Sequence, residues 1–167
     1  MGERLTRSDV EKIEKEIEER KLIKRKELIG AVKEARAQGD LSENFEYYAA
    51  KREKNQNESR IAYLERMLKF ATVIDDSSKE DEVGLNNTIN ILYVDDESEE
   101  EIKLVTSIRA NPLKGMYSIE SPIGRAIKGR HVGDVCTVRT DEGFEYDVKI
   151  LSIDNSSDDA EDTIMQY

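Results

Sequence analysis

Two carboxylates, Asp40 and Glu43, are the residues of this sequence whose types and spacing could do chemistry. They stand three residues apart at the expected start of a helix, so their Cβ atoms could lie within about 5–6 Å of each other. Carboxylates this close can share a hard divalent cation such as Mg²⁺, or orient a water molecule. Two carboxylates alone hold Mg²⁺ weakly, because such sites normally add waters and substrate phosphates. Any chemistry here therefore requires a partner that supplies the remaining ligands.

The same spacing also has a purely structural interpretation. Asp-x-x-Glu is an acidic form of the capping box, and negative charge is favourable at a helix N-terminus. On this interpretation Asp40 or Ser42 caps the helix that follows. The two roles are compatible, because a cap uses one oxygen and leaves others free. Since caps are far commoner than metal sites, the spacing by itself favours capping.

Two long helices must position these carboxylates. Ser8 and Glu11 form a capping-box signature for the first, expected over about residues 9–38, and Gly39 is a natural stop because glycine can turn left-handed. Apolar residues recur at three- and four-residue steps on both sides of the turn, namely Val10, Ile13, Ile17, Leu28, Val32 and Ala35, then Phe45, Tyr48, Ala49, Ile61, Leu64, Leu68 and Ala71. A turn near residues 39–42 matches the two stripes end to end, with Ala35 beside Tyr48. The middle of the second helix is polar, so we expect residues 1–76 to form a protruding antiparallel coiled-coil hairpin.

The rest of the chain indicates a small β-rich domain over residues 77–154. Four stretches alternate apolar and polar residues, around 89–93, 102–108, 136–138 and 146–150, and Pro122 opens a short helix between them. The expected order is β-β-β-α-β-β, which makes the chain an α+β protein. Residues 155–167 are polar and acidic, and we expect this tail to be disordered.

Composition excludes several classes of protein. The chain of 167 residues has 38% charged and 37% hydrophobic residues, against about 25% and about 45–50% in a typical globular chain, so one large core is not expected. The single cysteine, Cys136, excludes an internal disulfide framework, and the single histidine, His131, stands in a turn without a visible catalytic partner. No membrane-length apolar run or secretion signal is visible, so we expect a cytoplasmic protein with no membrane partner.

Charge is divided unevenly along the chain. Residues 1–74 hold 17 Lys and Arg against 15 Asp and Glu, whereas residues 75–167 hold 9 against 22. Seven of the basic residues fall between Arg20 and Arg36. This run could contact a polyanion, although a solvated helix face explains it more simply.

Two stretches of sequence are specific enough to suggest a protein family. They are residues 39–51, GDLSENFEYYAAK, and residues 121–129, SPIGRAIKG, followed by Val132-Gly-Asp134. The first resembles the tip motif, and the second the C-terminal signature, of the bacterial Gre transcript-cleavage (transcription elongation) factors. With the order of elements, the resemblance covers about residues 5–153. The acidic chain with a mildly basic hairpin is closer to the GreA branch than to GreB.

The resemblance implies a coiled-coil hairpin followed by an FKBP-like domain that docks on RNA polymerase. The hairpin would enter the polymerase secondary channel and stimulate the polymerase's own cleavage of the backtracked nascent RNA 3′ end, which rescues arrested complexes. The chain would be an accessory factor rather than an enzyme, a monomer without a cofactor of its own, and would meet DNA only within the elongation complex.

Site residues follow from the same resemblance. Asp40 and Glu43 match the catalytic tip acids, which share a Mg²⁺ ion with the polymerase active site. The other matching positions are Ser42 and Asn44 as tip support, Arg36, Lys51 and Arg52 as RNA-facing basic residues, and Glu120, Ser121 and Pro122 as polymerase-docking residues.

One segment departs from the family pattern, and other functions remain open. Residues 107–115, SIRANPLKG, replace a usually acidic segment, which bears on docking. Within the family, the alternative is a secondary-channel regulator or inhibitor that does not stimulate cleavage; intact Asp40 and Glu43 argue against it. Outside this activity, the alternatives are a prolyl isomerase or chaperone, suggested by fold analogy alone, and a nonspecific RNA-binding hairpin.

Overall fold

The computed structural model describes residues 2–39, 44–156, 158–160 and 162–165, and it divides the chain into two compact units. The first unit comprises Met1–Gly2 and Asp9–Ala71, and the second comprises Glu3–Ser8 and Thr72–Tyr167. The sequence placed a boundary after residue 76. The division falls earlier because strand β1 (Arg4–Leu5) pairs in parallel with β2 (Thr72–Val73), a pairing that the sequence did not predict.

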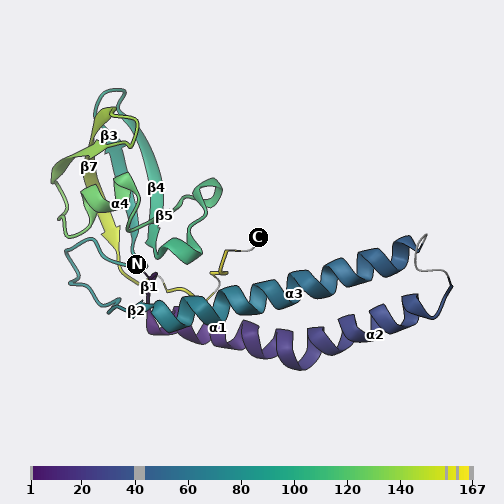
Figure 1. The fold of residues 1–167 in the computed structure, drawn as a ribbon. Coiled ribbons are helices and arrows are strands. Elements are labelled where there is room, and N and C mark those ends of the chain that lie inside the picture. Colours follow the sequence, from purple (N-terminus) through teal and green to yellow (C-terminus); the bar gives the residue numbers. More distant parts are fainter. Residues whose placement is uncertain (1, 40–43, 157, 161, 166–167) are drawn as a thin grey trace. The chain divides into compact units, whose positions relative to one another are not determined.

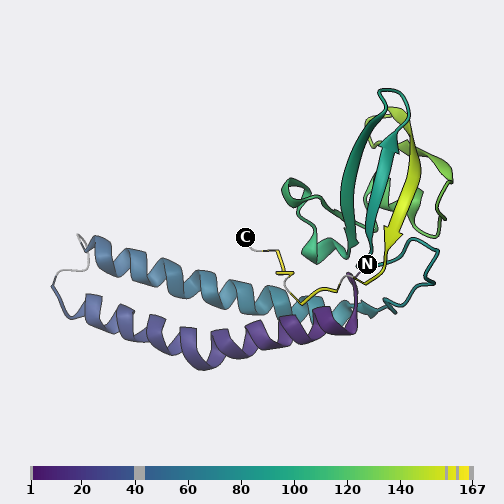
Figure 2. The ribbon, with the colours of Figure 1, turned by 180° about the vertical axis from the view of Figure 1, so that it is seen from behind.

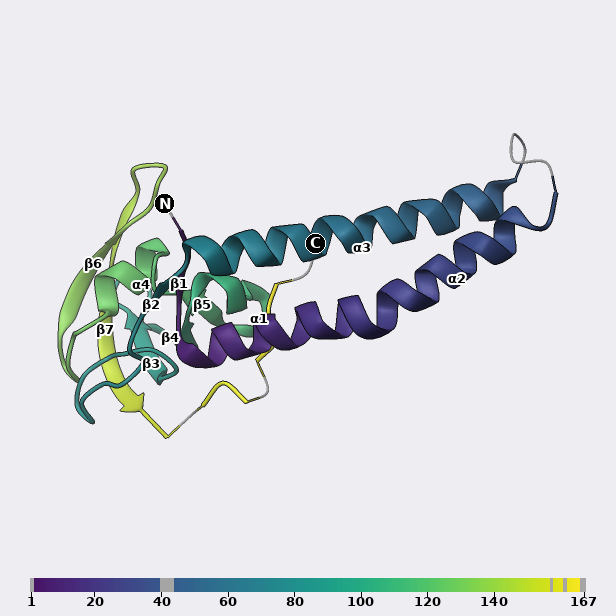
Figure 3. The same cartoon turned by 60° about the horizontal axis from the view of Figure 1, so that its bottom comes forward.

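The first unit is the predicted helical hairpin (Figure 1). One arm consists of α1 (Arg7–Glu19), a π-helix η1 (Arg20–Lys24) and α2 (Arg25–Arg36), and the other arm is α3 (Phe45–Phe70). Figure 3 shows the two arms side by side, with the end of α2 and the start of α3 at the same end of the hairpin. Because α1 begins at Arg7, the predicted cap Ser8 lies inside its first turn, and that prediction was wrong.

An apolar seam joins the two arms. The buried residues recur at helical spacing, Ile13, Leu28 and Ala35 on one arm and Tyr47, Ala50, Ile61 and Leu64 on the other. The expected partner of Ala35, Tyr48, was the wrong residue. Tyr48 is 47% exposed, whereas Tyr47 is 9% exposed. The buried positions of α3 recur at three-, four- and seven-residue steps, at residues 47, 50, 57 and 61, and this spacing turns Tyr47 rather than Tyr48 toward the first arm.

A network of polar side chains fills the middle of the hairpin, where the second helix lacks apolar residues. Glu16 Oε2 accepts hydrogen bonds from Arg20 Nε at 2.8 Å and from Arg60 Nε at 2.9 Å, across the two arms. Asn57 accepts from Arg20 Nη1 at 3.0 Å and donates to the Arg20 carbonyl at 3.3 Å. That carbonyl also accepts the Arg25 N–H, which is the π-helical bond of η1. The polar middle is therefore a specific set of cross-arm contacts rather than a solvated surface.

The second unit is built on a five-stranded sheet in the order β5-β4-β3-β7-β6 (Figure 2). Its strands are β3 (Thr88–Tyr93), β4 (Ser98–Val105), β5 (Met116–Ser118), β6 (Val135–Arg139) and β7 (Glu145–Asp154). The pairs β3–β4, β3–β7 and β6–β7 are antiparallel, and β4–β5 is parallel. Together with the short helix α4 (Pro122–Ile127), this gives the predicted β-β-β-α-β-β order and confirms the α+β class.

The core of the second unit forms between the sheet and α4. Buried Ile89, Ile91 and Ile150 from the strands pack in one cluster with Ile123 and Ile127 of α4. Two 3₁₀ turns, η3 (Ser107–Arg109) and η4 (Pro112–Lys114), join β4 to β5. Across the described residues, the helices are all too short or too polar to cross a membrane.

Candidate functional site

The structure describes the residues that come directly before and directly after the predicted catalytic tip in the sequence. Asp40, Ser42 and Glu43 lie outside the described residues. On one side, Gly39 has φ +133°, in the region that favours glycine, which agrees with its predicted role in ending the first arm. On the other side, Asn44 begins α3. The site is therefore defined structurally by the last turn of α2, Gly39 and the first turn of α3.

Asn44 is the N-cap of α3, and it also ties the two arms together. Its Oδ1 accepts the Tyr47 N–H at 3.0 Å, and its Nδ2 donates to the Ala35 carbonyl at 2.6 Å. The interpretation of Asp40 and Glu43 as a capping box was wrong, because α3 starts at Phe45 and its cap comes after both acids. The N-cap of α3 is therefore Asn44.

We predict that Asn44→Ala loosens the base of the tip. It removes the cap and the bond to Ala35, and loss of a cap costs about 1 kcal/mol. Amide hydrogen exchange at Tyr47 should accelerate, whereas exchange near Ile61, far along α3, should not change. Asn44→Asp keeps the acceptor and is the matched control. Equal exchange at Tyr47 in the Ala and Asp variants would contradict the assigned cap.

The predicted RNA-facing basic residues stand on the two helix ends next to this tip. Arg36 closes α2, and Lys51 and Arg52 lie in the second turn of α3; all three are exposed. The Arg36 guanidinium lies 5.5 Å from the centre of the Tyr47 ring. Hydrogen bonding to Arg36 lowers the pKa of the Tyr47 hydroxyl. These contacts hold Arg36 at the end of the hairpin and leave Lys51 and Arg52 facing solvent.

Part of the basic run in the first arm serves the hairpin itself. Arg25 makes two hydrogen bonds to Glu58, at 2.8 and 2.9 Å, and Lys21 pairs with Glu65 at 2.7 Å. With Arg20 in the central network and Arg36 on the Tyr47 ring, four of the seven basic residues contact the opposite arm. The structure therefore favours the structural explanation of this run over contact with a polyanion.

The predicted docking residues form an ordered turn in the second unit. Ser121 caps α4: its Oγ accepts the Gly124 N–H at 3.1 Å and donates to the Ser118 carbonyl at 2.6 Å. Pro122 occupies the first turn, as predicted. A Cβ at Gly124 would lie 2.0 Å from the Ser118 oxygen, so only glycine fits there. The turn is fixed by these contacts, and it presents Glu120 exposed to solvent.

A contact that the sequence analysis missed links Glu120 to the segment 107–115. Ser107 Oγ lies 3.2 Å from Glu120 Oε2 and 2.7 Å from Ser118 Oγ. No sequence signal pointed to Ser107, because the pairing arises from the parallel placement of β5 beside β4. The divergent segment thus contributes directly to the orientation of a candidate docking residue.

The remaining chemical candidates have structural explanations. Cys136 is buried in the sheet, and burial raises the pKa of its thiol, which disfavours a reactive thiolate. His131 is exposed in a turn in which the Asp134 carboxylate accepts its backbone N–H at 2.8 Å. Within the part of the chain that the structure describes, His, Cys, Asp and Glu side chains form no group of three that could hold a metal ion.

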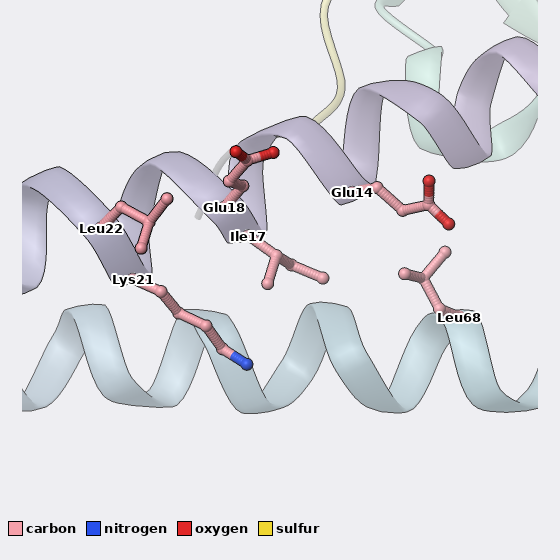
Figure 4. Close-up of a pocket in the computed structure, with 6 residues that line it drawn as sticks. All are labelled: Glu14, Ile17, Glu18, Lys21, Leu22 and Leu68. Carbon is pink, nitrogen blue, oxygen red and sulfur yellow. The ribbon is translucent and has the colours of Figure 1, made fainter.

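A shallow groove also lies along the hairpin (Figure 4). Ile17, Leu22 and Leu68 provide its apolar surface, and Glu14, Glu18 and Lys21 add charged side chains around it. Leu22 is 65% exposed and belongs to the π-helix η1. The groove places apolar atoms at the surface of the first arm without a group that could do chemistry.

Comparison with known proteins gives matches over both units. A family model described as "Transcription elongation factor, N-terminal" (GreA_GreB_N) matches residues 3–73, and one described as "Transcription elongation factor, GreA/GreB, C-term" matches residues 78–155. The chain is 43% identical over 153 residues to the transcription elongation factor GreA of Streptococcus gordonii, covering 91% of this chain and 95% of that protein. It is 41% identical to GreA of Streptococcus pneumoniae over 154 residues, 92% of this chain and 96% of that one.

Solved structures were compared with the chain as well. The crystal structure of GreA factor homolog 1 (Gfh1) from Thermus thermophilus is 25% identical, covers 92% of this chain and 99% of that chain, and has a TM-score of 0.43.

Proposed function

Because the chain belongs to the GreA/GreB family of transcription elongation factors, we propose that it binds RNA polymerase and stimulates cleavage of backtracked nascent RNA. The hairpin would enter the secondary channel and bring its tip to the polymerase active site. The observation that carries the proposal is that Asn44 supplies the N-cap of α3, so the cap comes after Asp40 and Glu43 in the sequence. Because that cap requires neither acid, both carboxylates can serve as ligands in a partner's site.

Asp40 and Glu43 would act as ligands in a site completed by the polymerase. Two carboxylates suit Mg²⁺ by their chemistry, and a shared Mg²⁺ would supply charge neutralisation and an activated water for phosphodiester hydrolysis. Asn44 would hold the base of the tip, with Ser42 as neighbouring support. Arg36, Lys51 and Arg52 would attract the phosphates of the RNA 3′ end by charge. The chain would carry no catalytic centre of its own.

This function sets the expected partners and surroundings. The protein would act as a monomer in the cytoplasm, where it meets the polymerase and the RNA 3′ end. It would contact DNA only as part of the elongation complex. The chain's net charge of −11 opposes free association with nucleic acid, which supports a polymerase-dependent mode of binding.

The direct test uses a stalled, backtracked elongation complex with a labelled transcript. Added protein should shorten the RNA from its 3′ end and allow the polymerase to resume synthesis when nucleotides are restored. The protein mixed with the same RNA without polymerase should cut nothing. Binding to the complex without transcript shortening would overturn the proposal in favour of a secondary-channel regulator or inhibitor.

Glu120→Lys should weaken polymerase binding without unfolding the second unit. Glu120 is exposed, so reversing its charge costs little folding free energy, but it reverses the charge of the proposed docking turn. We expect about a tenfold loss of affinity, in the range found when a charge at an interface is reversed. Glu142→Lys makes the same charge change at an exposed turn elsewhere in the unit and should bind normally. Equal affinities of the two folded variants, measured by titration against polymerase, would remove Glu120 from the docking surface.

A further inference from the structure

A buried guanidinium in the second unit forms an ion pair with a carboxylate of the C-terminal tail. The side chain of Arg109, in turn η3, is 0% exposed. Its Nη1 donates to Asp162 Oδ2 at 2.8 Å and to Asn86 Oδ1 at 2.8 Å. A charge buried this deeply is stable only when it is paired and hydrogen-bonded, so the contact with Asp162 is part of what keeps Arg109 inside.

The same carboxylate also meets a second cation. Lys103 Nζ, from strand β4, lies 3.1 Å from each oxygen of Asp162, whose side chain is 8% exposed. Charge-assisted hydrogen bonds of this kind are stronger than neutral ones. Lys103 and Arg109 thus present two positive groups to one carboxylate, which is the donor set of a carboxylate-binding site.

Backbone contacts extend the site along the tail. The Met165 N–H donates to the Ile108 carbonyl at 2.7 Å, and Lys103 Nζ donates to the Asp158 carbonyl at 2.5 Å. Ile164, between the two anchoring residues Asp162 and Met165, is 7% exposed. The sequence had predicted that residues 155–167 are disordered, whereas the described tail residues Asp158, Asp162 and Met165 make specific contacts with the domain.

We propose that Lys103, Arg109 and the Ile108 carbonyl form a binding site for an acidic peptide segment, and that the tail residues 158–160 and 162–165 occupy it in cis. The recognised feature is an aspartate carboxylate followed three residues later by a backbone N–H that donates to the Ile108 carbonyl. A tethered ligand has a high effective concentration, so an outside peptide must compete with it. Two of the three groups, Ile108 and Arg109, lie in the segment 107–115 that departs from the family pattern, and their turn η3 also carries Ser107, the partner of Glu120. Occupancy of the site therefore holds the turn that orients Glu120. Peptide binding at this site does not require the proposed activity, whereas any effect on Glu120 rests on the proposed docking function.

A labelled peptide with the sequence of residues 158–167 tests the site on full-length protein. Asp162→Lys places a third cation beside Lys103 and Arg109, which should release the tail. We expect this variant to bind the peptide at least about tenfold more tightly than the wild-type chain does, because the cis competitor is gone. The matched control is Glu142→Lys, which makes the same charge change at an exposed turn outside the site, and this variant should behave like the wild type. A peptide carrying Asn in place of Asp162 should lose most of the binding.

A second measurement tests the proposal even if Asp162→Lys fails to fold. In full-length Asp162→Asn, the Met165 and Arg109 amides should exchange with solvent at least about tenfold faster than in Glu142→Gln, since the charge-assisted contacts of Asp162 with Lys103 and Arg109 have been weakened. Unchanged exchange at both amides overturns the proposal. Equal affinity of the folded Asp162→Lys variant and the wild-type chain for the peptide also overturns it. So does equal affinity for the peptide with Asp162 and the peptide with Asn at that position.

Discussion

Asp40→Asn should abolish most of the stimulated transcript cleavage while leaving the folded protein and its affinity for polymerase nearly unchanged. The substitution preserves size and removes one negative charge, which a shared Mg²⁺ requires. Loss of a ligand to a catalytic metal typically costs orders of magnitude in rate, and we expect at least about a hundredfold loss here. Glu43→Gln should behave in the same way. The assay is the shortening of a labelled transcript in a backtracked complex.

The structure makes this test sharper than the sequence alone allowed. Had Asp40 been the helix cap, any loss of activity could have come from a frayed tip. Because Asn44 holds the Tyr47 N–H and the Ala35 carbonyl, helix content should not depend on Asp40. Circular dichroism of Asp40→Asn should therefore match the wild type, which separates the chemical role from the structural one.

Two controls complete the experiment. Raised Mg²⁺ should partly restore cleavage in either variant, since mass action offsets a weakened site. Glu46→Gln makes an equivalent change at an exposed acid in the first turn of α3 and should cleave normally. If Asp40→Asn and Glu43→Gln both cleave at the wild-type rate, the tip acids are not the catalytic ligands, whatever the family membership suggests.

The hairpin and the sheet could be predicted because their signals are local and periodic. The apolar stripe through Ile13 and Leu28, and the stripe through Ile61 and Leu64, fix which helix faces meet. Alternation around Ile89 and Ile91 fixes a strand in the same way, and Pro122 marks the start of α4. These features are set by burial of apolar area, and the spacing of apolar residues in the sequence predicts which faces are buried.

The errors fall where side-chain geometry decides the outcome. Several residues near the tip could cap a helix, and only the backbone path selects Asn44 over Asp40 or Ser42. The sequence of the hairpin's middle looked solvated because it is polar, but polar residues are buried there as partners of one another. Likewise, an acidic tail gave no hint that Asp162 meets a buried Arg109. Pairs distant in sequence carry no periodic signal.

The central network of the hairpin has a consequence for function, because it fixes how the two arms align. Glu16 accepts hydrogen bonds from Arg20 on its own arm and from Arg60 on the other. Asn57 donates a hydrogen bond to the Arg20 carbonyl at the start of the π-helix. These side chains fit in one register only, whereas an apolar seam tolerates sliding. A buried polar set that specifies register is the best-attested role for such groups in coiled coils. The distance from the hairpin base to its tip then depends on this network.

Glu16→Leu should destabilise the hairpin by about 3 kcal/mol. The change leaves Arg20 and Arg60, whose side chains are 15% and 9% exposed, without the carboxylate that lies between them, and breaking such a pair typically costs about 3–5 kcal/mol. Glu19→Leu replaces an exposed acid of the same helix and should cost less than about 0.5 kcal/mol. Amide hydrogen exchange around residues 57–61 localises the effect to the hairpin. Replacing Glu16, Arg20 and Arg60 together by apolar residues should recover much of the stability, since no charge is then left unpaired. Its transcript cleavage should stay impaired even so, because the register would no longer be specified. A stable triple variant with wild-type cleavage would show that the network contributes stability alone.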